Sequence, residues 1–102
     1  MKKQVDSKVG TMLDVTFEVQ FTDEAITHYQ SLDANITRRV DNAMDILVHN
    51  PLFGPNIVKL KGQYAGLYRY RVGRYRIIYR IDMQNHRCII RGIYPRGKAY
   101  HS

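Results

Sequence analysis

The first part of the chain changes its hydrophobic period once. Val15, Phe17, Val19 and Phe21 alternate with polar residues, and this period of two predicts a strand with one buried face. After these residues the apolar positions recur at helical spacing instead. Thr22 has the side chain of a good N-cap, so we expect a short helix to begin directly after it.

A longer second helix is expected next. Asp33 or Asn35 can cap its start, and Asn50-Pro51 should end it, because a residue that precedes proline avoids the helical conformation. One side of this segment is apolar and the other polar, as in a helix packed against a core. The apolar stripe consists of Ile36, Val40, Ala43, Met44 and Leu47.

The rest of the chain shows strand patterns separated by brief turns. A short strand or extended arm is expected at 56–61, and further strands at 68–72, 75–81 and 87–94. The order βααβββ predicts an α+β fold in which two helices pack on one face of a small, mainly antiparallel sheet. Residues 1–13 lack a useful period, so we expect an extension at 1–13 and one domain at 14–102, with Met1 or Met12 as the start.

Composition narrows the classes of function. Sixteen Lys and Arg against nine Asp and Glu give a net charge of +7, which favours nucleic acid as the first partner class and an acidic protein as the second. A single cysteine, Cys88, cannot form an internal disulfide, and no segment resembles a secretion signal or a membrane span. The cytoplasm is therefore the expected compartment. The four histidines lack neighbours at metal-ligand spacing, so we expect chemistry without a metal or cofactor.

An unusual group of arginines lies in the middle of the strand region. If Gly73-Arg74 is a two-residue hairpin turn, Arg71 lies opposite Arg76, and Arg69 shares their face of the sheet. Directly opposed like charges cost roughly 0.2 to 1 kcal/mol. The arrangement therefore favours a bound anion such as a phosphate, which the planar guanidinium fork can contact through two oxygens.

The next hairpin gives a second expectation about register. Pairing of Ile81 with Arg87 would place Gly92 beside Arg76, where the missing side chain would let a ligand approach closely. The segment 94–101 adds further donors and two phenols after the last strand.

A simpler interpretation of these patterns stays open. Alternating Arg and Tyr can mark a solvated face opposite a packed one, and the tyrosines at 68, 70, 75 and 79 can be core residues. Cys88 fits a small packing residue, and His28 and His49 fit surface positions on helices.

Four segments together resemble the RelE/ParE superfamily of bacterial toxins: VTFEVQFTDEA, HNPLFGPNIVKLKG, LYRYRVGRYRIIYRI and GIYPRGKAY. The similarity covers about residues 14–101, and its strongest element is a basic strand, a glycine, and then Tyr-Arg-Ile-Ile-Tyr. The resemblance implies a RelE-like fold and the toxin of a type II toxin–antitoxin system. It further implies a ribosome-dependent endoribonuclease that cuts messenger RNA in the decoding site and is held by a cognate acidic antitoxin.

The resemblance also implies roles for individual residues. The matching catalytic positions are Arg69, Arg71, Arg76, Arg96 and Tyr100. The first two are lysines in many RelE-type nucleases, and the spacing between Arg96 and Tyr100 is shorter here. Contacts with RNA or the ribosome are expected from Lys59, Lys61, Arg74, Lys98 and His101.

The chemistry expected of such a site is attack by the ribose 2′-OH without a metal. Arginines would neutralise the phosphorane-like state, and Tyr100 would accept the proton if nearby positive charge lowers its pKa from about 10. Two alternatives stay open. One is a ParE-like inhibitor that binds DNA gyrase without nuclease activity, and the other is a nucleic-acid-binding module without catalysis.

Overall fold

The computed structural model describes residues 15–97. The elements, in chain order, are β1 (Glu18–Phe21), α2 (Asp23–Gln30), α3 (Ala34–His49), β2 (Ile57–Lys59), the 3-10 helix η1 (Gly62–Tyr64), β3 (Leu67–Val72), β4 (Tyr75–Asp82) and β5 (Arg87–Pro95). This order confirms the predicted α+β class and βααβββ sequence, while η1 is an addition that the pattern did not predict. No helix within the described residues is long and apolar enough to cross a membrane.

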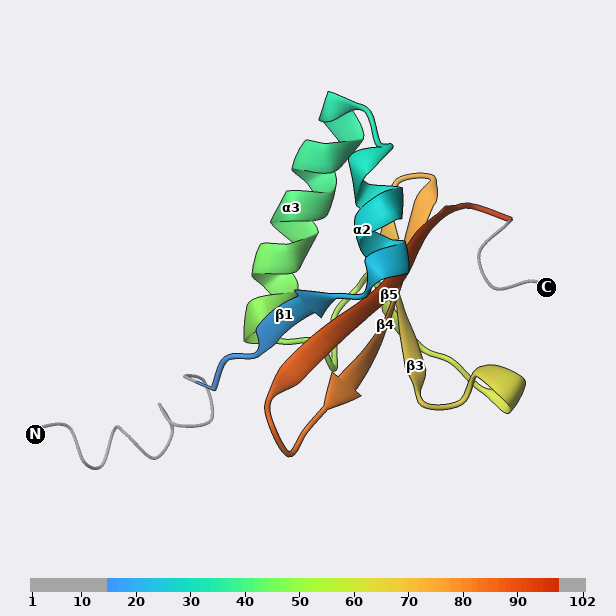
Figure 1. The fold of residues 1–102 in the computed structure, drawn as a ribbon. Helices are drawn as coiled ribbons and strands as arrows, with labels where there is room; N and C mark the ends of the chain where they lie inside the picture. Colours follow the sequence, from blue (N-terminus) through green and yellow to red (C-terminus); the bar gives the residue numbers. More distant parts are fainter. Residues whose placement is uncertain (1–14, 98–102) are drawn as a thin grey trace, which may run out of the picture.

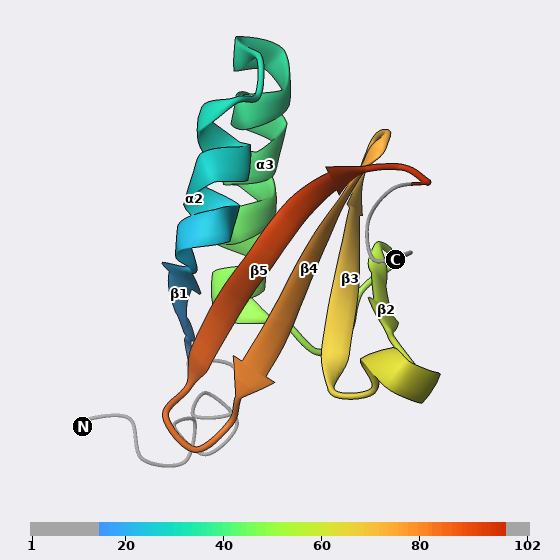
Figure 2. The ribbon, with the colours of Figure 1, turned by 45° about the vertical axis from the view of Figure 1, so that its right-hand side comes forward.

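The strands form one mixed sheet in the order β1-β5-β4-β3-β2. Strand β1 pairs with β5 in parallel, and the remaining neighbours are antiparallel, which confirms a mainly antiparallel sheet. Figures 1 and 2 show α2 and α3 side by side, with β1 next to them and β5, β4 and β3 side by side in the sheet. Helix α2 contacts β5, and α3 contacts β1 and β3.

Both helices begin at the capping residues that the sequence offers. The Thr22 hydroxyl accepts a hydrogen bond from the Ala25 N–H (3.1 Å), which confirms the predicted start of α2. Asp33, rather than Asn35, caps α3 by accepting from the Ile36 N–H (2.9 Å). The start of each helix is thus fixed by a side chain that accepts a hydrogen bond from a backbone N–H group. That N–H group has no acceptor within the helix.

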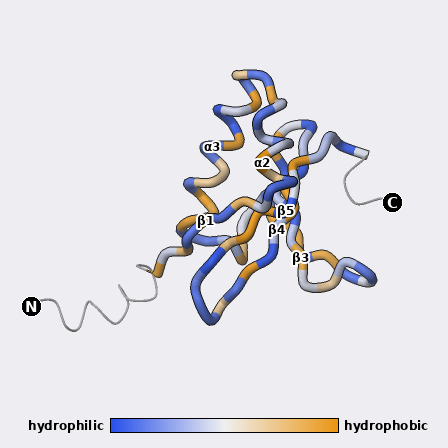
Figure 3. Tube along the Cα trace, viewed as in Figure 1, coloured by the Kyte–Doolittle hydropathy of each residue, from blue (hydrophilic) through white to orange (hydrophobic). Residues whose placement is uncertain are grey.

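The hydrophobic core lies between the helices and one face of the sheet. Helix α3 contributes Val40, Ala43 and Leu47, and the strands contribute the buried residues Tyr70, Val72, Ile77, Tyr79, Cys88, Ile90 and Ile93. Figure 3 shows hydrophobic positions along β4 and β5, and a hydrophilic turn between the two strands. The prediction of core tyrosines is confirmed, since Tyr68 and Tyr75 also pack against this cluster.

Two fully buried side chains of the core, Tyr79 and Cys88, carry polar groups that are removed from water. The Tyr79 hydroxyl donates to the Pro51 carbonyl oxygen (2.7 Å), so its polar atom is satisfied although the residue is fully buried. Burial raises the pKa of the Cys88 thiol to about 12, so this cysteine stays a neutral packing residue as predicted.

The register of the first hairpin is as predicted, but that of the second is not. Arg71 pairs with Arg76, whereas Ile81 pairs with Cys88 rather than Arg87. The turn after β4 is one residue shorter than expected, because Asp82 still belongs to the strand and its carboxylate accepts the Asn85 N–H (3.1 Å).

An irregularity at Ile78/Tyr79 then shifts the pairing of β4 with β5 by one more residue. As a result Gly92 lies opposite Ile78, and Tyr94 lies opposite Arg76. The expectation that Gly92 lies beside Arg76 is therefore wrong.

Candidate functional site

The face of the sheet turned away from the core carries a group of basic residues. Side chains alternate along each strand, and directly paired residues share a face, so the pairing places Arg69 and Arg71 of β3 with Arg76 and Arg80 of β4. We call these four residues the arginine face. Figure 2 shows β3, β4 and β5 side by side, with α2 and α3 to one side of them.

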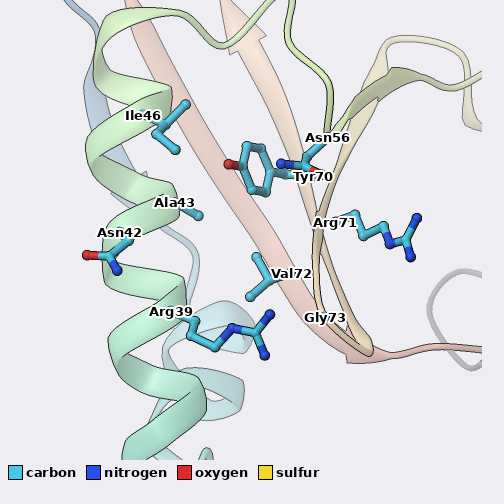
Figure 4. A pocket seen from close by; sticks show the side chains of 9 residues that line it. All are labelled: Arg39, Asn42, Ala43, Ile46, Asn56, Tyr70, Arg71, Val72 and Gly73. Carbon is cyan, nitrogen blue, oxygen red and sulfur yellow. The ribbon is translucent and has the colours of Figure 1, made fainter.

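Arg71 and Arg76 are opposed at the end of the first hairpin, yet their side chains differ. Arg76 Nη1 donates to the carbonyl oxygens of Tyr75 (3.1 Å) and Gly73 (3.3 Å), so this guanidinium is drawn toward the turn. The Arg71 side chain is exposed, and Figure 4 shows it directed away from α3. An anion placed between the two would relieve their mutual repulsion.

The end of β5 brings two further predicted arginines to this hairpin. The Arg96 N–H donates to the Arg74 carbonyl oxygen (2.6 Å), which ties the exit from β5 to the turn between β3 and β4. Both residues, with Pro95, line a hollow of about 400 Å³. The structure therefore gathers Arg74 and Arg96 at the same end of the sheet as Arg71 and Arg76, although some twenty residues of sequence separate Arg74 from Arg96.

Two other predicted site residues that the structure describes, Lys59 and Lys61, do not join this group. Lys59 pairs with Tyr68 and so lies on the helix-facing side of the sheet, opposite to the arginine face. Lys61 is exposed in front of η1. Lys98, Tyr100 and His101 lie outside the described residues.

One cluster beside the arginine face was missed by the sequence analysis. Tyr94 lies opposite Arg76, its hydroxyl donates to a Glu24 carboxylate oxygen (3.3 Å), and its ring contacts the His28 ring at a centroid distance of 4.9 Å. His28 also accepts a hydrogen bond at Nδ1 from the Ile93 N–H (3.0 Å). The prediction of His28 as a plain surface residue is therefore wrong, because it supplies a partner for the backbone at the open edge of β5.

No pattern of neighbouring residues indicated this cluster, because its members come from segments far apart in the sequence. Tyr94 could be placed opposite Arg76 only from the register of β5, and Glu24 is 70 residues away in sequence. Arg80, by contrast, follows Arg76 at a distance of four in a strand, and this alternation would have assigned it to the same face.

The electrostatics of the cluster define what Tyr94 can do. Desolvation, followed by the nearby Glu24 carboxylate, raises the pKa of the Tyr94 phenol. The phenol therefore stays protonated at neutral pH, where it can donate a hydrogen bond but cannot act as a base.

A pocket on the other side of β3 shares one lining residue, Arg71, with the arginine face. It has a volume of about 440 Å³ and lies between α3 and the β3 strand. Figure 4 shows Arg39 reaching from α3 toward Gly73, whereas Arg71 points away on the far side of the strand. Within the described part of the chain, no group of three His, Cys, Asp or Glu side chains could hold a metal ion.

Comparison with protein families gives one match over most of the domain. Residues 19–100 match the family described as the ParE toxin of the type II toxin–antitoxin system parDE. A comparison with curated protein sequences finds no match.

Solved structures give a consistent set of similar folds. The archaeal RelE in a RelE–RelB complex from Pyrococcus horikoshii is 33% identical, with 82% of this chain and 99% of that chain covered and a TM-score of 0.69. The toxin–antitoxin complex RelBE2 from Mycobacterium tuberculosis gives 30% identity, 80% and 100% coverage and a TM-score of 0.72. The isolated RelE toxin of E. coli shares the fold (TM-score 0.69, 82% and 88% coverage) at only 14% identity.

Proposed function

This chain belongs to the ParE toxin family of type II toxin–antitoxin systems, within the RelE/ParE superfamily. From its similarity to RelE toxins and from its arginine face, we propose that it is an endoribonuclease that cuts messenger RNA on the ribosome. The arginine face would bind the substrate backbone. Cleavage at that face would stop translation.

The observation that carries this proposal is the opposed pair Arg71 and Arg76, with Arg74 and Arg96 at the same end of the sheet. Cross-strand pairing of like charges destabilises a sheet unless something compensates for it. Phosphate is a suitable counter-charge, because a guanidinium can donate two parallel hydrogen bonds to its oxygens. Solubility alone would not require two arginines to lie directly opposite each other on neighbouring strands.

The reaction that suits such a face is transesterification within the RNA. The 2′-oxygen loses its proton and attacks the adjacent phosphorus, the bond from phosphorus to the 5′-oxygen breaks, and that oxygen takes up a proton. Arginines placed around the phosphate stabilise the extra negative charge of the phosphorane-like state. The products are a 2′,3′-cyclic phosphate and a 5′-hydroxyl.

Proton transfer needs a group other than the arginines, since guanidinium does not lose its proton at physiological pH. Tyr94 is unsuited to the task because its pKa is raised. We assign the role of proton acceptor to Tyr100, as the resemblance implies, with positive charge from Arg71, Arg76 and Arg96 favouring its ionised form. The described face offers no strong base, so we further propose that the ribosome supplies the orientation of the substrate.

The partner that restrains this activity would be a cognate antitoxin. The P. horikoshii and M. tuberculosis relatives were both solved as toxin–antitoxin complexes. For this chain, with its net charge of +7, we propose an acidic antitoxin that covers the arginine face.

A cleavage assay on programmed ribosomes tests the proposal. The full-length toxin should cut a message placed in the decoding site, leave a 5′-hydroxyl and a cyclic phosphate, and cut the same naked message poorly. Arg71→Ala should lose this activity, while Arg38→Ala, which removes the same charge from α3, should retain it. Intact message after incubation with the wild-type toxin would contradict the proposal.

The family match also favours a second candidate, a ParE-type inhibitor of DNA gyrase. In that case the arginine face would bind protein or DNA rather than position a phosphate for cleavage. A supercoiling assay with purified gyrase separates the two. Inhibition of supercoiling, with ribosomal message left intact, would establish the second candidate in place of the first.

A further inference from the structure

We propose that Tyr94 is a stacking platform for one unpaired base of the substrate RNA, next to the phosphate bound by the arginine face. This inference rests on the proposed function, because it specifies how the same face would hold the strand. It gives the face a preference for single-stranded RNA whose bases are free to leave the stack.

The first step is the position of Tyr94. The pairing of Arg71 with Arg76, and of Arg76 with Tyr94, puts the three residues in one row across β3, β4 and β5. Directly paired residues share a face and have Cβ atoms about 4.5 to 5.5 Å apart. Tyr94 and Arg76 therefore start from neighbouring positions on one face, although the Arg76 guanidinium leans toward the turn and the Tyr94 ring toward Gly92. A base and the adjoining phosphate of one strand could contact these two side chains from the same side of the sheet.

The second step is the orientation of the ring. A Cβ atom built on Gly92 would lie 2.5 Å from Tyr94 Cε2 and 2.6 Å from Cζ and from the hydroxyl oxygen. The ring thus occupies the space directly over Gly92, on the face of the sheet that carries the arginines. Gly92 does not have a positive φ, so its backbone does not require glycine, and the ring is what excludes a side chain there.

The third step is that the ring is held in place before any ligand arrives. Its hydroxyl is anchored by Glu24, and His28 contacts it edge-on with an interplanar angle of 66°. His28 is itself fixed by the hydrogen bond from the Ile93 N–H. A fixed ring loses little side-chain freedom when a base stacks on it, which favours binding. Tyr94 is only partly buried, so ring surface remains available.

These features match the way in which proteins bind single strands. Aromatic side chains on an open sheet surface stack on bases, while neighbouring basic groups bind the phosphates. Every base has a π-face, so the platform should accept any base with little preference. Removal of one such ring is expected to weaken binding on the order of tenfold to a hundredfold.

The test measures binding without cleavage. The probe is a short 2′-O-methyl RNA with one 2-aminopurine, whose fluorescence reports stacking and which lacks the attacking 2′-OH. Full-length wild-type protein should bind this probe. Tyr94→Phe, which keeps the ring and its contact with His28 but loses the hydrogen bond to Glu24, should bind it within a few-fold of the wild type and give a similar fluorescence change. Tyr94→Leu should bind at least tenfold more weakly and lose that change.

Two more variants separate a platform from a structural role. Gly92→Ala keeps the ring but adds a Cβ where it lies, so it should weaken binding like Tyr94→Leu. Tyr29→Leu is the matched control, because Tyr29 also donates to a carboxylate, that of Asp41 (2.7 Å), but from α2 toward α3. Tyr29→Leu should bind the probe like the wild type.

A double-mutant cycle gives the decisive result. An abasic nucleotide in place of the 2-aminopurine should weaken wild-type binding by the same factor as Tyr94→Leu, and the two changes together should cost no more than either alone. Equal binding of the abasic and 2-aminopurine probes by the wild type, or additive losses, would overturn the platform. A different result would be that the wild type binds the 2-aminopurine probe more tightly than the abasic probe but does not cut the message on ribosomes. This result would contradict the proposed nuclease activity and still support the platform.

Discussion

At the scale of single residues, identical side chains have different roles. Arg71 and Arg76 are both arginines on one face, yet only Arg76 is shown donating to the carbonyl oxygens of the turn. Likewise Tyr79 is fully buried, whereas Tyr94 is partly exposed beside the arginines. Some of these residues therefore serve function and others serve stability, and substitutions can test each role.

Arg71→Ala should abolish toxicity without loss of stability. Its exposed guanidinium contributes repulsion rather than a bond to the fold, so its removal should leave the free energy of unfolding unchanged or raise it by a few tenths of a kcal/mol. Growth after induction and urea unfolding measure the two effects. Growth arrest as strong as that of the wild type would show that this arginine is dispensable.

Arg76→Ala should also abolish toxicity, but with a small cost in stability. The two turn carbonyl oxygens lose a charged donor, and because water can replace much of it, we expect a loss of at most about 1 kcal/mol. Urea unfolding beside Arg71→Ala checks the difference. A variant more stable than the wild type would contradict a supporting role for these hydrogen bonds.

Tyr79→Phe should lower the stability of the protein but leave its cleavage activity unchanged. Loss of the hydroxyl leaves the Pro51 carbonyl oxygen without its buried donor, which should lower the free energy of unfolding by about 1 to 2 kcal/mol. Cleavage by the folded variant should be normal, since the side chain lies on the core side of the sheet. Thermal unfolding together with the ribosome assay tests both halves.

At the scale of elements, the hairpin of β3 and β4 sets the geometry of the site. Gly73 has a φ of 55° and is the first of two loop residues, the position at which a II′ hairpin turn needs glycine. This turn fixes the pairing of Arg71 with Arg76. The arginine face therefore depends on one glycine that makes no chemical contribution to it.

Gly73→Ala should destabilise the protein by roughly 1 to 2 kcal/mol, because an L-residue at this φ brings its Cβ too close to its own backbone. The Arg39 guanidinium, 2.8 Å from the added Cβ, must also move. Gly54→Ala is the control, since its φ is not positive and its nearest contact is 3.3 Å from Ile57 Cδ1. Equal unfolding midpoints for the two variants in urea would argue against a strained turn.

At the scale of the whole molecule, positive charge governs association. The chain carries a net charge of +7, and arginines gather at one end of the sheet. Attraction between opposite charges accelerates the encounter of two proteins, and salt screens it.

Capture by an acidic antitoxin should therefore slow as ionic strength rises, while the dissociation rate changes little. Stopped-flow mixing of toxin and antitoxin over a range of salt concentrations measures both rates. The Arg71→Ala/Arg76→Ala double variant should show a weaker dependence on salt than Arg38→Ala paired with Arg39→Ala. An association rate that does not respond to salt would exclude electrostatic steering.

The sequence by itself determined the features that depend on near neighbours. The periods of two and 3.6, the caps Thr22 and Asp33, and the two-residue turn at Gly73 act within a few residues of the chain. The class of fold, the order of the elements and the pairing of Arg71 with Arg76 follow from them. The resemblance to the toxin superfamily rests on the same local motifs.

Only the tertiary structure decided what depends on pairing between distant segments. The parallel contact of β1 with β5 joins strands nearly 70 residues apart, and no local period encodes it. The shorter turn after β4 and the irregularity at Ile78/Tyr79 each shifted the pairing by one residue, and together they put Tyr94 rather than Gly92 opposite Arg76. Arg96 reached Arg74 and Glu24 reached Tyr94 for the same reason: such contacts arise when the sheet and helix assemble, and they leave no mark in the pattern along the chain.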